Sequence, residues 1–227
     1  MTDAGARKWS RGQRTRELTR VLRPAGFERR GDEWILDTPE LRWWVHLGTA
    51  KGDAHEHELA VGSLILRDGE PDYDAPHPAT FGLGDLPGAS RRRYLDTDEA
   101  AQDPLVLDTE ALLIPLLARL RTIDSVIEMW LAGDVAAGTV SDSRPLQVWH
   151  AWLLAKSTDR YVLADRALMI AETVRWTPDA RRILADLGMP VDRPARRPKN
   201  LTAADRLVQR AYVRRFSPYA DAERLPL

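Results

Sequence analysis

Histidine and carboxylate side chains gather in one short polar segment, His55-Glu56-His57, which is the clearest candidate for metal chemistry. In an extended chain His55 and His57 point the same way, and two imidazoles so placed can bind one metal ion. The ligand set could be completed by one of three further side chains, Asp53, His46 or His77. The zinc-protease spacing, with histidines four residues apart on a helix, is absent. A polar loop with two solvated histidines explains the same residues, so neither a metal nor a cofactor is predicted.

A glycine-rich stretch, Gly82 to Gly88, precedes an arginine triplet at positions 91–93. Glycine loops expose backbone N–H groups, and arginine pairs with phosphate oxygens, so the combination suits an anion. Neither phosphate-loop fingerprint matches, however, and no strand followed by a helix is expected around it. We interpret the stretch as a loop with a charged edge, whose arginines can also pair with the acids that follow.

No catalytic residue is predicted. The chain has no cysteine, which excludes disulfides, thiolate zinc sites and cysteine nucleophiles. The serine elbow of the α/β-hydrolases is also missing. Carboxylate pairs are abundant, but catalysis needs carboxylates with shifted pKa values in a cleft, and the sequence indicates no cleft.

The segment LRWWVHLG, residues 41–48, carries a candidate ligand-binding set. In a strand, Leu41, Trp43, Val45 and Leu47 point to one face, which is a typical core face. The opposite face then holds Arg42, Trp44 and His46. In a small-ligand-binding protein or an enzyme, this arginine would hold an anion, the tryptophan would stack and the histidine would transfer a proton.

Charge is distributed unevenly along the chain. The net charge is −1, but residues 1–30 carry nine basic and three acidic side chains, and residues 189–227 carry nine and four. The stretch between them therefore holds a net charge of −12, and eleven of its acids lie in residues 68–110. Either the basic ends neutralise this acidic body, or its field attracts a basic partner.

The preferred hypothesis is a non-enzymatic binding protein whose acidic surface engages a basic protein partner. In its sharpest form the protein neutralises a nuclease toxin by imitating phosphate charge, as an immunity factor would. The predicted partner-binding residues are Asp72, Asp74, Asp96, Asp98 and Glu99. As an alternative, the basic ends bind nucleic acid. The residues concerned are those of the N-terminal helix, Arg7, Lys8, Arg11, Arg14, Arg16 and Arg20, and those of the basic linker near the C-terminus, Arg193, Arg196, Arg197 and Lys199.

The elements that must position these residues follow from periodicity and turn residues. Residues 7–23 predict a helix, which Pro24 and Gly26 end. A hairpin about Gly31–Asp32, the strand 41–47 and a doubly covered strand at 58–66 follow. Residues 68–104 form a long loop with a short strand near 92–95, and an apolar stripe predicts a helix from Asp108 to Gly133, kinked or divided at Pro115. Further helices are expected after Ser143, near Asp159, at Thr177-Pro178 and at Thr202.

The predicted fold is therefore α+β, with an N-terminal helix, a small antiparallel sheet, a long helix and a mainly helical C-terminal half. We expect an α+β domain at 1–133, a helical extension at 134–189, a basic linker at 190–200 and a C-terminal helix and tail at 201–227. Apolar residues make up 44% and charged residues 30% of the 227, as in a globular protein. No signal peptide or membrane span is indicated, so we predict a cytoplasmic protein without membrane contact.

One run of residues carries a family resemblance. Leu22-Arg23-Pro24-Ala25-Gly26-Phe27-Glu28-Arg29-Arg30-Gly31-Asp32-Glu33-Trp34 resembles the opening of the bacterial domain-of-unknown-function family DUF four-three-zero-four. The resemblance extends over roughly residues 8–133 and implies an α+β domain without established catalytic residues. Such families sometimes occur near bacterial toxin systems, which is the source of the immunity-like expectation. After about residue 134 the chain departs from the pattern.

Overall fold

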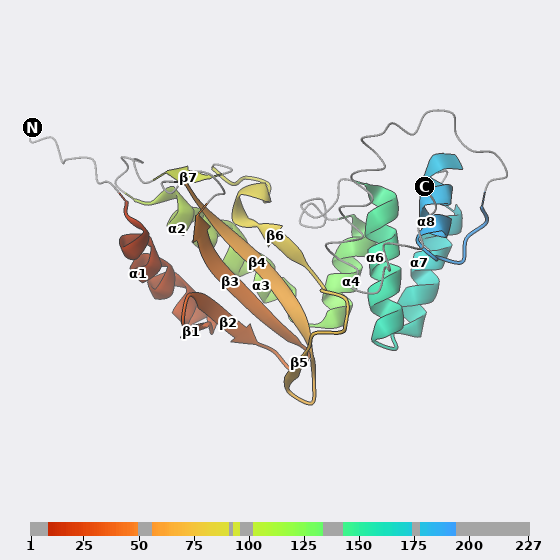
Figure 1. Ribbon diagram of the computed structural model, residues 1–227, viewed down its shortest axis with the longest axis horizontal. Helices are drawn as coiled ribbons and strands as arrows, with labels where there is room; N and C mark the ends of the chain where they lie inside the picture. Colours follow the sequence, from red (N-terminus) through yellow and green to blue (C-terminus); the bar gives the residue numbers. More distant parts are fainter. Residues whose placement is uncertain are drawn as a thin grey trace, which may run out of the picture.

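The computed structural model describes residues 9–49, 56–90, 93–95, 102–133, 143–173 and 178–193 (Figure 1). Helix α1 (Arg11–Leu22) is followed by the strands β1 (Glu28–Arg30), β2 (Glu33–Asp37), β3 (Leu41–Thr49), β4 (Glu56–Arg67), β5 (Glu70–Asp72), β6 (Thr80–Gly82) and β7 (Tyr94–Leu95). The helices α2 (Pro104–Asp108), α3 (Ile114–Arg119), α4 (Ile123–Ala132), α6 (Arg144–Ser157), α7 (Tyr161–Thr173) and α8 (Pro178–Asp186) complete the order. The predicted α+β class is confirmed.

The sheet is antiparallel and built around β4. Strands β1 to β5 follow one another in order, while β6 and β7 also pair with β4. Three short strands thus share one edge of β4, and β3 occupies the other. Gly31 has φ +61°, a left-handed conformation that glycine adopts without strain, and it turns the predicted β1–β2 hairpin.

One face of the sheet is the core face. Trp43, Val45 and Leu47 of β3 are at most 2% exposed, which confirms the predicted alternation. Helix α1 covers this face, where Trp34 Nε1 donates to Thr19 Oγ1 at 3.0 Å. Trp43 Nε1 donates to the carbonyl of Leu120, so the segment that ends α3 covers the same face.

The expected helix from Asp108 to Gly133 proves to be several shorter pieces. Asp103 caps α2, a π-helical segment spans Thr109–Leu113, and Pro115 lies in the first turn of α3. Thr122 then opens α4 with a capping box, and Gly133 ends it at φ +70°. The residues of the apolar stripe lie mainly in helices, as predicted. Asp103 and Thr122 set the helix boundaries, because their side chains accept backbone N–H groups.

Helices α4, α6, α7 and α8 form a helical half beside the sheet (Figure 1). Helix α6 packs against α4, α7 and α8, and its buried residues include Trp149 and His150. The helix expected from Thr202 lies outside the described residues. Within the described part of the chain, no helix has both the length and the apolar character needed to cross a membrane.

Candidate functional site

The outer face of the sheet, opposite the core face, is the candidate site. In the register of β3, Arg42, Trp44 and His46 share this face. Their cross-strand neighbours on β2 and β4 are Asp37, Ile35, Glu33, Leu64, Gly62 and Ala60. Figure 1 shows α2 and α3 behind the sheet, so this face is turned to the viewer. The side chains that cover the core face come from α1 to α3, and the outer face keeps Trp44 and His46 partly exposed.

The Trp44 indole lies against Gly62 of the neighbouring strand, β4. A Cβ atom added to Gly62 would lie 2.3 Å from Trp44 Cζ2 and 2.5 Å from Cε2, so the indole occupies the space that any other residue would fill. Ile35 and Leu64, each 8% exposed, flank this pair. The result is an apolar centre in which the indole lies against Gly62 and remains partly exposed.

Arg42 is already paired. Its guanidinium donates to both carboxylate oxygens of Asp37, at 2.7 and 2.9 Å. These hydrogen bonds lower the pKa of Asp37 and raise the pKa of Arg42. A bidentate pair of this kind occupies the donors that would bind an anionic ligand.

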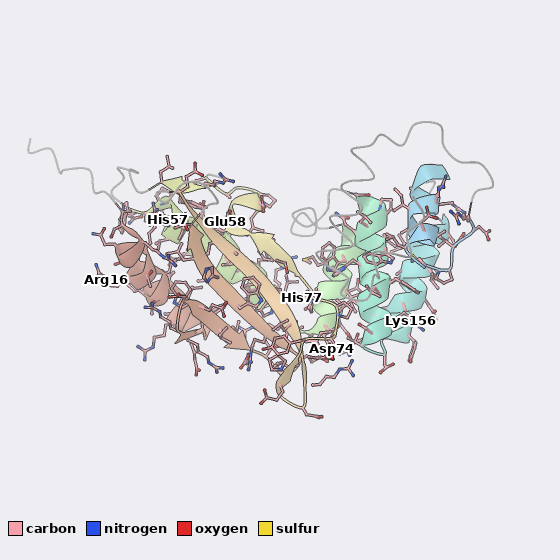
Figure 2. The ribbon with its side chains drawn as sticks, viewed as in Figure 1. Arg16, His57, Glu58, Asp74, His77 and Lys156 are labelled. Carbon is pink, nitrogen blue, oxygen red and sulfur yellow. The ribbon has the colours of Figure 1, made fainter. Side chains whose placement is uncertain are left out.

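The remaining charges leave one end of the outer face acidic. Arg30 pairs with Glu28 at 3.4 Å, and Arg93 pairs with Glu56 at 2.7 Å. Glu33, opposite His46, and Glu58, opposite Gly48, are exposed and have no ion pair within the described residues. Figure 2 shows Glu58 toward the upper end of β4. Glu33 is two positions along β2 from the residue opposite Trp44, and Glu58 is four positions along β4, so the acidic end shares the outer face with Trp44.

The histidines do not converge. His57 is 1% exposed on the core face, whereas His46 lies on the outer face, so the sheet separates them. His77 belongs to the loop before β6, and His55 and Asp53 lie outside the described residues. Among the residues that the structure describes, no group of three or more potential ligands is placed to hold a metal ion.

The predicted acidic set is only partly described. Asp72 pairs with Arg67 at 2.6 Å, and its other oxygen accepts the backbone N–H groups of Asp74 and Ala75. Asp72 therefore stabilises the turn after β5. Asp74 is exposed, as Figure 2 shows, while Asp96, Asp98 and Glu99 lie outside the described residues.

In the glycine-rich stretch, a side chain of the stretch itself accepts one of the backbone N–H groups. The Asp85 carboxylate accepts the N–H of Gly82 at 3.2 Å, which closes the short helical turn Leu83–Asp85. A carboxylate thus occupies a donor that a phosphate would use. Of the arginine triplet, Arg93 is paired with Glu56, and Arg91 and Arg92 lie outside the described residues.

The N-terminal helix presents fewer basic groups than its sequence indicates. Arg14 is 0% exposed and donates to Asp103 at 2.8 Å and to the carbonyls of Tyr94 and Leu95. Arg20 pairs with Glu17 at 2.8 Å. Arg16 points to solvent (Figure 2). This geometry reduces the surface that the nucleic-acid hypothesis requires.

Sequence reasoning missed the buried polar network around Arg14. Tyr94 donates to the Asp108 carboxylate at 2.6 Å, and Ser90 donates to the same oxygen. Burial and this carboxylate raise the pKa of Tyr94. The signal available in the sequence was Arg14 itself, which lies four residues before Leu18 and so shares the helix face of the apolar residues.

The comparisons add no relative: no protein-family model matches the chain, and no curated protein or solved structure matches it significantly. The resemblance over residues 8–133 therefore stays a prediction. The functional argument rests on the residues of the outer face.

Proposed function

We propose that this chain is a non-enzymatic binding protein that engages a basic protein partner through the outer face of its sheet. The observation that carries the proposal is the Trp44 indole, which lies against Gly62 on a face whose Glu33 and Glu58 have no described ion pair. A partly exposed aromatic side chain on a face with such carboxylates suits an arginine or lysine side chain of a partner.

The proposal keeps the expected partner class but moves the contact surface. Asp72 is held by Arg67 and by the turn that it caps, so it contributes little free negative charge. Glu33 and Glu58 carry that charge beside an aromatic anchor. Tryptophan and arginine are the residues on which binding energy is most often concentrated.

The kind of partner follows from this chemistry. A nuclease toxin whose nucleic-acid groove is lined by arginine and lysine presents the required positive surface. In this proposal the chain acts in the bacterial cytoplasm as an immunity-like factor. The small-ligand alternative is less well supported, because Arg42 would first have to leave Asp37.

Affinity capture tests the proposal. The wild-type chain and the double variant Trp44→Ala/Glu58→Lys are used as baits in a lysate of the source organism, with mass spectrometry as the readout. We expect the wild type to enrich a basic protein that the double variant loses. Asp165→Lys, an exposed change on α7, is the matched control and should retain the protein. Equal enrichment by the wild type and the double variant would refute the role of the outer face.

A further inference from the structure

The carbonyl of Pro78 links two helices of the helical half to the loop before β6. Pro78, in the loop before β6, accepts a hydrogen bond from Trp130 Nε1 of α4 at 2.9 Å. The same oxygen lies 3.3 Å from His150 Nε2 of α6. The next residue, Ala79, is fastened to β4, because its N–H donates to Ser63 Oγ and its carbonyl accepts the N–H of Ser63. Pro78 is thus a point where two helices hold the sheet.

His150 fits this joint only in its neutral form. A carbonyl can only accept, so Nε2 carries the proton, and Nδ1 is buried without a hydrogen-bond partner. The ring packs against Trp130, with centroids 4.7 Å apart. A second proton would create a buried cation. Burial accordingly lowers the pKa of His150 to about 4. The backbone of Pro78 and of His77 opposes the effect of burial on the pKa of His150 but does not cancel it.

His77 adds a second histidine to the joint. Figure 2 shows it between the sheet and α4. Burial lowers the pKa of His77, and a hydrogen bond to the backbone of Ser63 opposes that effect. His150 contacts Trp130, Trp149 and Pro78, and His77 is the titratable group that acts on it among the described residues. No described carboxylate compensates a charge there.

The two halves are also held near the C-terminal end of α6, by different chemistry. Arg67 of β4 donates to the carbonyl of Ser157 at 3.3 Å. Arg160, between α6 and α7, pairs with Glu40 of the β2–β3 turn and with Asp124 of α4. The other oxygen of Glu40 accepts the N–H of Ile123 at 3.0 Å. This attachment uses an arginine and carboxylates, which stay charged in mild acid.

We infer that the His77–Pro78–His150 joint is an acid-sensitive hinge, which opens in mild acid and lets the helical half move about the Glu40–Arg160–Asp124 attachment while both halves stay folded. Opening exposes the histidines to water, where their charged forms are solvated. The inference concerns the joint alone and is independent of any partner on the outer face.

A distance measurement tests the hinge. Because the chain has no cysteine, Asp32→Cys and Asp165→Cys place one fluorophore on the exposed β1–β2 turn and one on α7 of the full chain. We expect the energy-transfer efficiency to change as the pH falls from about 7 to about 4.5, while the far-ultraviolet circular dichroism stays constant. In the labelled His150→Phe/His77→Gln chain, the midpoint should fall by at least about one pH unit, because both titrating groups are gone.

The controls separate a hinge from general acid unfolding. His46→Gln removes an outer-face histidine and should leave the midpoint unchanged. If His150→Phe does not fold at pH 7, His77→Gln alone, at a partly exposed position, should still lower the midpoint. Parallel loss of energy transfer and circular dichroism overturns the inference, and so does a midpoint that neither histidine variant moves.

Discussion

At the scale of single residues, the position of the Trp44 side chain requires glycine at position 62. A strand interior seldom benefits from glycine, because glycine loses more backbone freedom on folding than any other residue. Here any Cβ would meet the indole at 2.3 Å, so glycine is what allows Trp44 to lie against β4. The pair is therefore best understood as a surface feature, which the fold maintains at a small cost in stability.

This interpretation predicts an unusual outcome for Gly62→Ala. The obstructing atoms belong to a partly exposed side chain that can rotate away, so the free energy of unfolding should change by only about 1 kcal/mol. Partner binding should nevertheless weaken as much as in Trp44→Ala, by about 2 kcal/mol or roughly thirtyfold. Urea denaturation and a binding titration measure the two effects. Gly12→Ala, which has open space around its Cβ in α1, is the control and should not alter binding.

For the buried pair of Arg14 and Asp103 we predict a large change in the free energy of unfolding, in contrast to Gly62→Ala. Arg14→Met leaves a carboxylate with 0% side-chain exposure without its arginine, which should cost about 3–5 kcal/mol of unfolding free energy. Arg16→Met, two residues away on the exposed side of α1, should change it by less than about 0.5 kcal/mol. Urea denaturation of both variants checks the comparison. Equal effects would show that Arg14 is not the structural residue described here.

At the scale of secondary structure, period-two alternation was a reliable guide and helix boundaries were not. Residues 41–47 specified which side chains face the core, because a strand allows only two directions. The stripe of apolar residues up to Trp130 predicted helix without showing where it breaks. The breaks occur where side chains bond to the backbone in place of helical hydrogen bonds. Thr122 does this through its capping box and so begins α4. Spacing could indicate that Trp44 and His46 share a face, but the pairing of Arg42 with Asp37 and the position of Trp44 over Gly62 depend on strand register.

The cap of α4 makes this argument testable. Thr122→Ala removes the side-chain oxygen that accepts the N–H of Ser125 at 3.1 Å, and should destabilise the protein by about 1 kcal/mol. Thr122→Ser retains the hydroxyl and should restore most of that loss. Thermal denaturation of the three proteins distinguishes a capping effect from a packing effect, since serine without the methyl group would not repair packing.

At the scale of the whole molecule, the buried histidine makes stability depend on pH. His150 has a pKa of about 4 in the folded protein against 6.5 ordinarily, because burial disfavours its charged form. Between these values the unfolded chain, and the chain opened at the joint, bind a proton that the closed chain does not, so this contribution to the closed form is complete above about pH 6.5 and is lost as the pH falls toward 4. The loss should reach at most about 3 kcal/mol. Urea denaturation across this range measures the slope, and a slope that is no smaller in His150→Phe would contradict the assignment.

The distribution of paired and unpaired charges over the molecule supports the proposal that the outer face binds a basic partner. Described arginines on or beside that face are paired with acids, whereas Glu33 and Glu58 are exposed carboxylates of that face without a described ion pair. Asp72 and Asp37 are neutralised by Arg67 and Arg42, which belong to the acidic body and not to the basic ends. From the N-terminal basic end, Arg14 pairs with Asp103 of the body. Neutralisation does not extend, within the described residues, to Glu33 and Glu58.

The most direct measurement is therefore a binding titration of the full chain with a fluorescent oligo-arginine peptide, followed by anisotropy at two salt concentrations. We predict salt-sensitive binding that Glu33→Lys/Glu58→Lys weakens at least about tenfold and that Trp44→Ala also weakens, while Asp165→Lys matches the wild type. Equal affinities of the wild type and the Glu33→Lys/Glu58→Lys chain would contradict the account, because the positive ligand would then be bound elsewhere.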